Sequence, residues 1–393
     1  MSSACIILCL NSGSSSRKFA LYRFDKDRSK SSQELMAEGA AERIGVEGGN
    51  LWIRDGTNNM LSKIERNFSD PDSALEFLFE EIERLKLPRP SAIGHRLVHG
   101  GPDHSAPERV TPHLIEALRR AIPFAPLHIP AQLQAIQAAA ARFPDVPQVA
   151  CFDTYFHRQM PEVAERFPLP HALWDEGVRR YGFHGISYEY IMSTLGGAAP
   201  GRIVIAHLGN GASMAAVRDG RPIDTTMGFT PTGGVMMGTR SGDLDPGLIV
   251  YLINQKHYDG RRLEQLVNHE AGLVGVSGIS SDMKTLLEKR ASEPSAALAI
   301  EMFCYQLRKQ IGAFAAALDG LDLLVFTGGI GERAAPIRDE VCAGLKHLGV
   351  RLDPDANQAH ADVISSKQSA CVVRVIPTNE DLMIARHTAQ LCL

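Results

Sequence analysis

Apolar and polar residues alternate along this chain with two different periods, which predicts a mixed α/β fold. Residues 5–10 form a buried strand that ends in a turn of Gly and Ser residues, and Phe19 and Leu21 resume the apolar pattern in a second strand. Further strands are expected near 51–53, at 92–98, at 148–152 and at 321–326. Between them, helical spacing predicts helices over 72–87, with Asp72 as N-cap, and over 130–142.

The longest predicted helix covers residues 293–318. Its apolar residues at helical spacing are Leu298, Met302, Leu307, Ile311 and Phe314. A closing helix is expected from Asn379 onward. Strands that alternate with helices are typical of α/β domains.

The opening strand, turn and strand recur halfway along the chain, at 202–220. A shift of 198 residues superposes Gly13 on Gly211 and Ser15 on Ser213, which indicates an internal duplication. A third glycine cluster, a predicted turn at 327–331, follows the strand at 321–326 and precedes a helix from Ala334.

Small residues let a backbone approach a polyanion such as phosphate, although each of these turns also suits an ordinary hairpin tip. GNGASM and GGIGERA both lack the last glycine of the dinucleotide fingerprint, and Thr239 stands where a P-loop requires Lys. A Rossmann dehydrogenase and a P-loop kinase are therefore disfavoured.

Size and composition indicate a globular protein of two domains. The chain has 393 residues and 42.8 kDa, more than one hydrophobic core usually serves. Its net charge is −4 and no basic block occurs, so nucleic acid and anionic membranes are not expected as partners. The apolar stretch 5–10 is too short for a signal peptide or a membrane span, and the seven cysteines form no C-x-x-C pair. We therefore expect a cytosolic protein with reduced thiols and no thiolate-bound metal.

Two arginines lie among glycines, Arg96 in GHRLVHGG and Arg240 in MMGTRSGDLDP. A guanidinium offers paired donors that suit phosphate or carboxylate, and an internal salt bridge, for instance to Asp103 or Asp243, is the alternative. His95 and His99 form a possible zinc pair. That interpretation is disfavoured because a third ligand, His113 or His128, would have to come from a loop.

Asp153 and Glu380 stand at or just past the carboxyl ends of predicted strands, where ligands of open α/β sheets collect. Either could hold Mg²⁺ through water or cap a helix. His184, in RRYGFHGIS, suits either a packed or a catalytic histidine.

Together these segments resemble the acetate kinase family of carboxylate kinases, in the group that shares its fold with actin, sugar kinases and the Hsp70 ATPase domain. The segments, in the family's order and spacing, are NSGSSSRKF, GHRLVHGG, APLHIPAQL, FDTYFH, RRYGFHG, AHLGNGAS, MGTRSGDLDP, FTGGIGER and IPTNEDLMIAR. The resemblance implies two duplicated α/β lobes of the actin-like ATPase (ribonuclease H-like) fold, each with a five-stranded mixed sheet, and a nucleotide cleft between them. The expected lobes are 1–152 plus 383–393 and 153–382.

The resemblance also implies the reaction, a reversible Mg²⁺-dependent phosphoryl transfer from ATP to acetate that gives ADP and acetyl phosphate, with Mn²⁺ as a substitute metal. It implies a homodimer. The phosphate path of the first lobe would be lined by Asn11, Ser14, Ser16 and Lys18. The phosphates would be held in the second lobe by His207, Leu208, Gly209, Asn210 and Gly211. The adenosine site would contain Asp282, Met283, Lys284, Gly329, Ile330, Gly331, Glu332 and Arg333.

At the reaction centre implied by the resemblance, Arg96 binds the carboxylate, Arg240 binds the phosphoryl group, and His184 donates to its oxygens. Asn11 and Glu380 belong to the magnesium site, and Asp153 matches the family's acid/base residue. Because a carboxylate substrate is already ionised near neutral pH, no general base is needed. We therefore interpret Asp153 mainly as a residue that orients the metal or its waters, in a transfer that depends on positioning and charge.

The sequence departs from the family at Met283 and Lys284, where Phe and Arg are common, which weakens the prediction of the nucleotide. Arg333 and Ile129 also stand where Asn is common. A propionate or butyrate kinase is an alternative that depends on the pocket around Val98, Leu127 and Pro231. An actin-like or chaperone-like ATPase is a third interpretation, but it would not need Arg96 and Arg240.

Overall fold

The computed structural model describes residues 4–12, 16–25 and 33–392, and the chain forms two compact units. Unit 1 comprises Met1–Tyr155 and Asn379–Leu393, and unit 2 comprises Phe156–Thr378. Asp153 and Glu380 therefore both fall in unit 1, whereas the sequence assigned them to the second lobe. Ser14, expected on the phosphate path, lies outside the described residues, as do Gly13 and Ser15 of the proposed repeat.

Unit 1 is built on a mixed sheet of eight strands in the order β5-β4-β3-β2-β1-β6-β8-β7. Their bounds are β1 Cys5–Ser12, β2 Ser16–Phe24, β3 Gln33–Glu42, β4 Asn50–Asp55, β5 Met60–Glu65, β6 Ala92–Leu97, β7 Glu108–Arg109 and β8 Gln148–Phe152. Strands β1, β6 and β8 are parallel, and the other neighbours are antiparallel.

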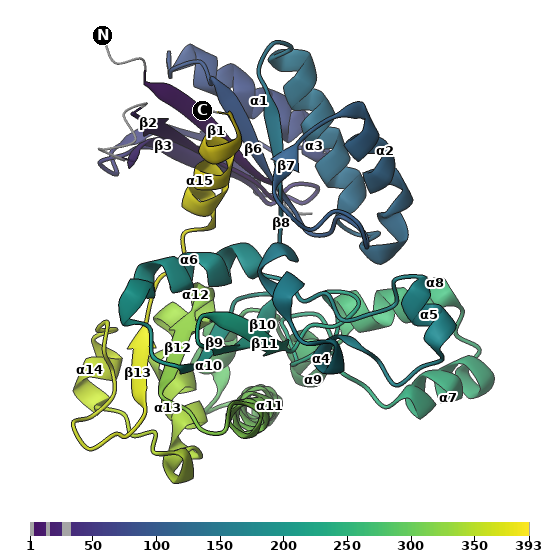
Figure 1. The fold of residues 1–393 in the computed structure, drawn as a ribbon, viewed down its shortest axis with the longest axis vertical. Coiled ribbons are helices and arrows are strands. Elements are labelled where there is room, and N and C mark those ends of the chain that lie inside the picture. Colours follow the sequence, from purple (N-terminus) through teal and green to yellow (C-terminus); the bar gives the residue numbers. More distant parts are fainter. Residues whose placement is uncertain (1–3, 13–15, 26–32, 393) are drawn as a thin grey trace. The chain divides into compact units, whose positions relative to one another are not determined.

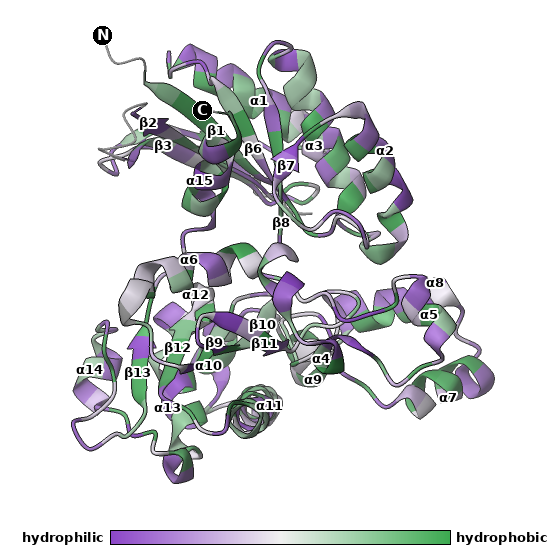
Figure 2. Ribbon diagram, viewed as in Figure 1, coloured by the Kyte–Doolittle hydropathy of each residue, from purple (hydrophilic) through white to green (hydrophobic). Residues whose placement is uncertain are grey.

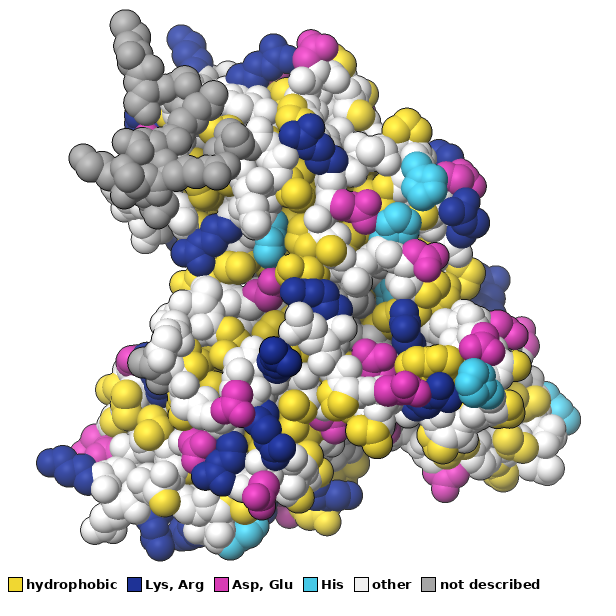
Figure 3. Space-filling view, viewed as in Figure 1, with side chains coloured by type: hydrophobic (Ala, Val, Ile, Leu, Met, Phe, Trp, Pro, Cys, Tyr) yellow, Lys and Arg dark blue, Asp and Glu magenta, His cyan; other side chains and the backbone are white. Residues whose placement is uncertain are grey.

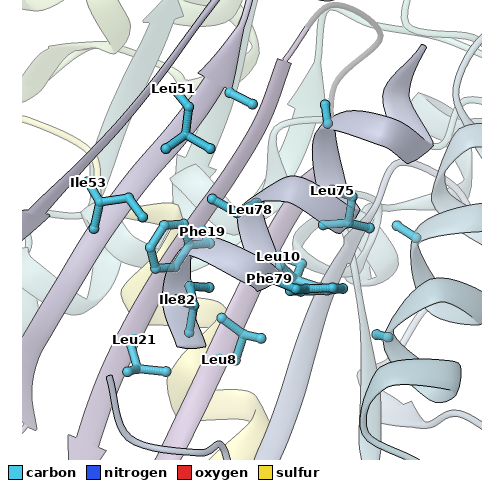
Figure 4. Close-up of a cluster of buried hydrophobic side chains, with 14 of the residues drawn as sticks. Leu8, Leu10, Phe19, Leu21, Leu51, Ile53, Leu75, Leu78, Phe79 and Ile82 are labelled. Atoms are coloured by element: carbon cyan, nitrogen blue, oxygen red, sulfur yellow. The ribbon is translucent and has the colours of Figure 1, made fainter. Parts of the chain in front are cut away.

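Helices cover both faces of this sheet (Figure 1). On one face, α1 (Pro71–Arg84) and α3 (Ile129–Arg142) bury apolar side chains against β1 and β2, and Figure 4 shows Leu75, Leu78 and Phe79 of α1 in this cluster. On the other face, α15 (Glu380–Cys392) packs on β1, β6 and β8. The approach is close, because a Cβ at Gly94 would lie 2.3 Å from Thr388 Oγ1. Unit 1 also contains helix α2 (Pro112–Arg120).

Unit 2 contains a five-stranded sheet in the order β11-β10-β9-β12-β13. Its strands are β9 Arg202–Leu208, β10 Ala212–Arg218, β11 Arg221–Thr225, β12 Leu323–Thr327 and β13 Val372–Val375. Helix α6 (Gly185–Leu195) packs its Tyr188, Ile191 and Leu195 on one face. Helix α11 (Pro294–Leu318) contacts β9 and β10.

The two sheets repeat one strand order, which supports the duplication that the 198-residue shift indicated. In unit 1 the order β3-β2-β1-β6-β8 has two antiparallel and two parallel pairings, and β11-β10-β9-β12-β13 has the same pairings in the same places. The expected five strands per lobe are correct for unit 2 and wrong for unit 1. There the antiparallel strands β4 and β5 extend one edge, and the short β7 extends the other.

Local signals were misread at three places. Helix α1 begins at Pro71 and is capped by Asp70, whose side chain accepts from Asp72 N and Ser73 N, so Asp72 is not the N-cap. The expected turn at 327–331 is largely the short helix α12 (Gly328–Arg333), which precedes α13 (Ala335–Ala343).

The third difference concerns the apolar spacing along α11. Leu307, Ile311 and Phe314 are buried, but Leu298 and Met302 are 51% and 36% exposed. With Tyr305 they form a second, exposed apolar stripe, because positions four and three residues apart share a helix face.

No helix within the described ranges is long and apolar enough to span a bilayer. On the face seen in Figure 3, Lys and Arg side chains are interspersed with Asp and Glu, as the balanced composition predicts.

Candidate active site

Arg96 is the centre of a polar cluster at the carboxyl edge of the unit 1 sheet. It lies near the end of β6, and Asp153 directly follows the neighbouring parallel strand β8, so both reach the same edge. Arg96 Nη2 donates to Asp153 Oδ2 over 2.7 Å, and Nε lies 3.1 Å from each carboxylate oxygen. The carboxylate of Asp153 therefore holds the guanidinium from one side.

Two further groups reach Arg96 from β1 and α15. Arg96 Nη1 donates to Asn11 Oδ1 over 3.1 Å and lies 3.5 Å from Glu380 Oε2. Asn11 Nδ2 in turn donates to Glu380 Oε2 over 3.2 Å. The alternative of Glu380 as a helix cap is wrong, because the oxygen that caps α15 is Asn379 Oδ1, which accepts from Leu382 N at 2.9 Å.

The salt-bridge alternative for Arg96 is thus realised, with Asp153 and Glu380 as the acidic partners. The side chains of Arg96, Asp153 and Glu380 are 21%, 2% and 14% exposed. Burial alone would lower the pKa of Arg96, but the charges of the two carboxylates outweigh burial and raise it above its ordinary value. The adjacent Asp381 has its pKa raised to about 6, first by burial and then by the charge of Glu380.

The donor set of this cluster suits a hard divalent cation. Asn11, Asp153 and Glu380 present amide and carboxylate oxygens within one hydrogen-bonded group, and Mg²⁺ prefers oxygen ligands while it keeps several waters. Within the described ranges, no group of three or more His, Cys, Asp or Glu residues has the spacing of a metal site.

Lys18 lies directly opposite Asn11 in the β1–β2 pairing and is exposed, which places a second cation beside the cluster. Ser16 opens β2. Val98 is buried one residue past β6, with its backbone N bonded to Gln132 Oε1, and Leu127 is 37% exposed in a turn of the same unit.

His95 and His99, the possible zinc pair, are both buried. In each, one ring nitrogen takes part in a hydrogen bond within the protein. His95 Nε2 donates to Gln148 Oε1 over 2.6 Å, and burial lowers the pKa of His95 to about 4. His99 Nδ1 accepts from Gly101 N over 2.8 Å. These contacts are those of packed structural histidines.

In unit 2, Gly211 brings Arg240 and His184 together. A Cβ at Gly211 would lie 2.6 Å from Arg240 Nη2 and 3.3 Å from His184 Nε2, so both nitrogens face this glycine. Arg240 Nη1 donates to Pro231 O over 2.6 Å. Pro231, expected in the substrate pocket, thus orients Arg240 through its carbonyl.

The loop that carries Arg240 rests on the glycine turn after β9. Gly238 N donates to Asn210 O over 3.1 Å, and a Cβ at Gly238 would lie 2.2 Å from Asn210 Oδ1. Glycine is required there because a larger residue would push the two loops apart.

The rings of His184 and His207 stack at 4.3 Å with an interplanar angle of 22°. His184 adopts the left-handed conformation, φ 58°, immediately before α6. Its Nδ1 lies 2.8 Å from Ser213 Oγ, and Tyr188 Oη lies 2.5 Å from the same oxygen. His207 Nδ1 lies 2.8 Å from Ser187 Oγ, which donates to Thr378 Oγ1.

The predicted adenosine residues occupy two places in unit 2. Glu332 Oε1 accepts hydrogen bonds from Gly328 N and Thr378 N. This carboxylate therefore links α12 to Thr378, the last residue of unit 2. Gly328 itself has φ 74° and lies against Leu208, at the end of β9. Of the same segment, Gly331 is buried, Ile330 is half-buried, and Gly329 and Arg333 are exposed.

Asp282 caps α10 (Met283–Lys289), since its Oδ2 accepts from Thr285 N. Met283 is buried and Lys284 is 85% exposed beside Glu288. Lys284 is therefore available to a ligand, whereas Met283 belongs to the core.

Sequence reasoning missed Tyr188, Ser187 and Thr378, which contact the two histidines directly or through one hydroxyl. Ser187 and Tyr188 follow His184 by three and four residues, the spacing that places side chains on one helix face. That spacing was readable from the sequence, but the role of Thr378, far along the chain, was not.

Comparison with known proteins adds full-length similarities. A sequence model described as the acetokinase family matches residues 6–386. An acetate kinase of Rhodopseudomonas palustris is 48% identical over 98% of both chains, and one of Phocaeicola vulgatus is 40% identical over 97% of this chain and 98% of its own. Among solved structures, Porphyromonas gingivalis acetate kinase has 36% identity and a TM-score of 0.85 over 99% of this chain and 100% of its own. A propionate kinase of Francisella tularensis has 36% identity and a TM-score of 0.89 over 98% and 100%.

Proposed function

Because this chain belongs to the acetokinase family, we propose that it is an acetate kinase, which transfers the γ-phosphoryl group of ATP reversibly to acetate and yields ADP and acetyl phosphate. The observation that carries the proposal is the identity of 48% to an acetate kinase over 98% of both chains. Family membership also confirms the predicted fold class, duplicated lobes of the actin-like ATPase fold.

On the carboxylate side, Arg96 binds the acetate. Asp153 holds its Nε and Nη2, and Asn11 and Glu380 contact its Nη1. A planar guanidinium with five N–H donors suits a carboxylate. Asp153 acts by orienting Arg96 and the waters of the metal, and the ionised substrate leaves no proton for it to remove.

Asn11 and Glu380 would hold Mg²⁺, with Asp153 beside them. The bound ion would neutralise negative charge on the phosphate oxygens. If this assignment is right, Asp153→Asn loses activity that a higher Mg²⁺ concentration or Mn²⁺ partly restores. Activity that is equally low at every metal concentration, with unchanged metal affinity, would contradict the role.

On the phosphoryl side, Arg240 and His184 stabilise the charge that develops during transfer. Both side chains point at Gly211, where the missing side chain leaves room for a phosphoryl oxygen to approach two donors. His207, Leu208, Gly209, Asn210 and Gly211 hold the phosphates of the nucleotide, and the segments at 282–284 and 329–333 bind adenosine. The exposure of Lys284 and of Gly329 supports this assignment.

The decisive test is an acyl hydroxamate assay with ATP, Mg²⁺, acetate and hydroxylamine, because hydroxamate forms only from an acyl phosphate. Propionate and butyrate run in parallel. A higher kcat/KM for propionate would favour the second candidate, a propionate kinase, which the similarity to the Francisella tularensis structure supports. ATP hydrolysis without hydroxamate would instead favour an ATPase module.

We further propose a homodimer that forms through exposed apolar side chains of unit 2. Helix α7 (Pro246–Lys256) contains no buried residue, and its Leu248, Val250, Tyr251 and Ile253 are 41% to 56% exposed. Figure 2 shows α7 as largely hydrophobic, and α11 adds the stripe of Leu298, Met302 and Tyr305. A second copy would cover such apolar surface. Light scattering would show twice 42.8 kDa, and Val250→Glu would shift the mass toward one chain.

We place the protein in the cytosol, because its cysteines suit that compartment. The cysteines are thiols, and six of the seven are buried, which suits a reducing compartment.

A further inference from the structure

We infer that Tyr188 and Ser213 are positioning residues that hold His184 in the tautomer with hydrogen on Nε2, so that His184 donates to the phosphoryl group. The inference rests on the proposed function for the identity of the acceptor. The relay itself consists of atoms in unit 2 alone, and its tautomer can be measured without substrate.

The relay is built by helix α6 and strand β10. Tyr188 lies one helical turn after His184, and its side chain leans toward the start of the helix, as side chains in helices do. There its Oη meets Ser213 Oγ at 2.5 Å, and the same oxygen lies 2.8 Å from His184 Nδ1. Tyr188 and Ser213 are both 0% exposed, so water does not compete for either hydroxyl.

The hydrogen bonds of this relay have a preferred direction. A phenol is more acidic than an aliphatic hydroxyl, so Tyr188 is the better donor and Ser213 Oγ accepts from it. Ser213 has a single hydrogen, which is then directed at His184 Nδ1. Since a neutral imidazole carries hydrogen on one nitrogen only, Nε2 must carry it when Nδ1 accepts.

This direction leaves the hydrogen of the imidazole on Nε2, the nitrogen that would donate to the phosphoryl group. Nε2 faces Gly211, and so does Arg240 Nη2. An N–H at Nε2 makes two converging donors for an anionic oxygen, whereas the opposite tautomer would turn a lone pair toward that oxygen.

A second relay fixes the position of the imidazole without setting its tautomer. Ser187, on the same helix, joins His207 Nδ1 to Thr378 Oγ1, and the ring of His207 stacks on that of His184. The ring of His184 thus stacks on His207 and is hydrogen-bonded at Nδ1 to Ser213. A change at Tyr188 or Ser213 therefore alters the tautomer while the stacked ring stays in place.

The test is the ¹⁵N chemical shift of both His184 ring nitrogens in the full chain labelled with ¹⁵N-histidine, with His184→Asn for assignment. We expect a protonated Nε2 and an unprotonated Nδ1 in the unaltered protein at pH 8. A protonated Nδ1 overturns the inference. This measurement requires no folded variant of the relay.

Tyr188→Phe and Ser213→Ala are the relay variants, and Ser193→Ala is the control, because Ser193 is exposed on α6 and its hydroxyl donates to the carbonyl of Tyr190 on the same helix. In the relay variants we expect mixed tautomers and a fall in kcat of about tenfold, with KM for both substrates within about twofold, because the lost donor acts in the transition state. Retention of the Nε2–H tautomer in both relay variants overturns the inference, whatever kcat does. Absence of acyl hydroxamate in the unaltered protein would refute the proposed function alone.

Discussion

Replacing Arg96 by Ala is expected to lower both activity and stability, because it removes a cation from between two acidic side chains. Arg96 makes three short contacts with Asp153, one with Asn11, and an ion pair with Glu380. Asp153 is 2% exposed, so its charge would lose these donors without gaining much water. Removal of one partner from a buried pair costs about 3–5 kcal/mol, a large part of the total stability of a typical domain.

The assay is urea unfolding at pH 7 followed by circular dichroism, for Arg96→Ala, Asp153→Asn and the double variant. With a slope of about 2–3 kcal/mol per M, the single Arg96 variant should unfold at a urea concentration lower by about 1–2.5 M. The double variant should recover part of that loss, because a buried neutral amide replaces a buried charge that has lost the guanidinium. It should recover no activity, since Arg96, the donor that we propose binds the carboxylate, is still absent.

If Arg96→Ala unfolded at the same urea concentration as the unaltered protein, the ion pair would contribute nothing and the reasoning would be wrong. If the stability losses of Arg96→Ala and Asp153→Asn simply added in the double variant, that result would also contradict a coupling between the two side chains. Hydroxamate formation should fall about a hundredfold or more in either Arg96 variant. The sequence alone led us to expect an intact fold for this change, and the contacts of Arg96 revise that expectation.

Three further predictions concern other parts of the molecule. Arg240→Ala should lower kcat/KM about a hundredfold through loss of a donor at Gly211, with little change in unfolding, and near-normal activity would make this arginine a purely structural group. Acetate should be preferred over propionate by about 1–3 kcal/mol per methylene, and Val98→Ala should raise the ratio of kcat/KM for propionate over acetate, whereas an unchanged ratio would assign Val98 to packing alone. Burial, partly offset by a hydrogen bond to Phe183 O, lowers the pKa of His157 to about 4. The unfolded chain therefore binds the extra proton first, and His157 should lower stability by about 1.4 kcal/mol per pH unit below about pH 6.5, down to about pH 4, in addition to the similar contribution of His95. His157→Gln should make this slope less steep in urea unfolding at pH 7 and pH 5, and an equal slope would refute the assignment.

Much of the fold followed from local patterns in the sequence. The hairpin of β1 and β2, the parallel strands β6 and β8, and helices α3 and α11 lie where period and capping signals predicted them. The errors arose where two signals overlapped. Pro71 made Asp70 the better N-cap than Asp72, and α11 carries two apolar stripes, which spacing alone cannot distinguish.

The contacts within each cluster were harder to predict than its members. Arg96 was identified by its glycine-rich surroundings, but its partners Asp153 and Glu380 are 57 and 284 positions away, and only the sheet edge and α15 bring them together. Likewise, no pattern in the sequence shows that the carbonyl of Pro231, a residue predicted to line the substrate pocket, accepts a hydrogen bond from Arg240.

The return of α15 to the first sheet has a consequence for synthesis of the chain. The ribosome produces all of unit 2 before it reaches Asn379. The face of β1 and β6 around Cys9 and Gly94, on which α15 packs, is therefore not covered by α15 while residues 156–378 are translated. A nascent chain halted before residue 379 can complete the five-stranded sheet, yet it lacks Glu380 and the helix that covers the other sheet. The polar cluster around Arg96 is therefore assembled last, and a chain truncated near its end would present an unfinished, apolar first unit to chaperones and proteases.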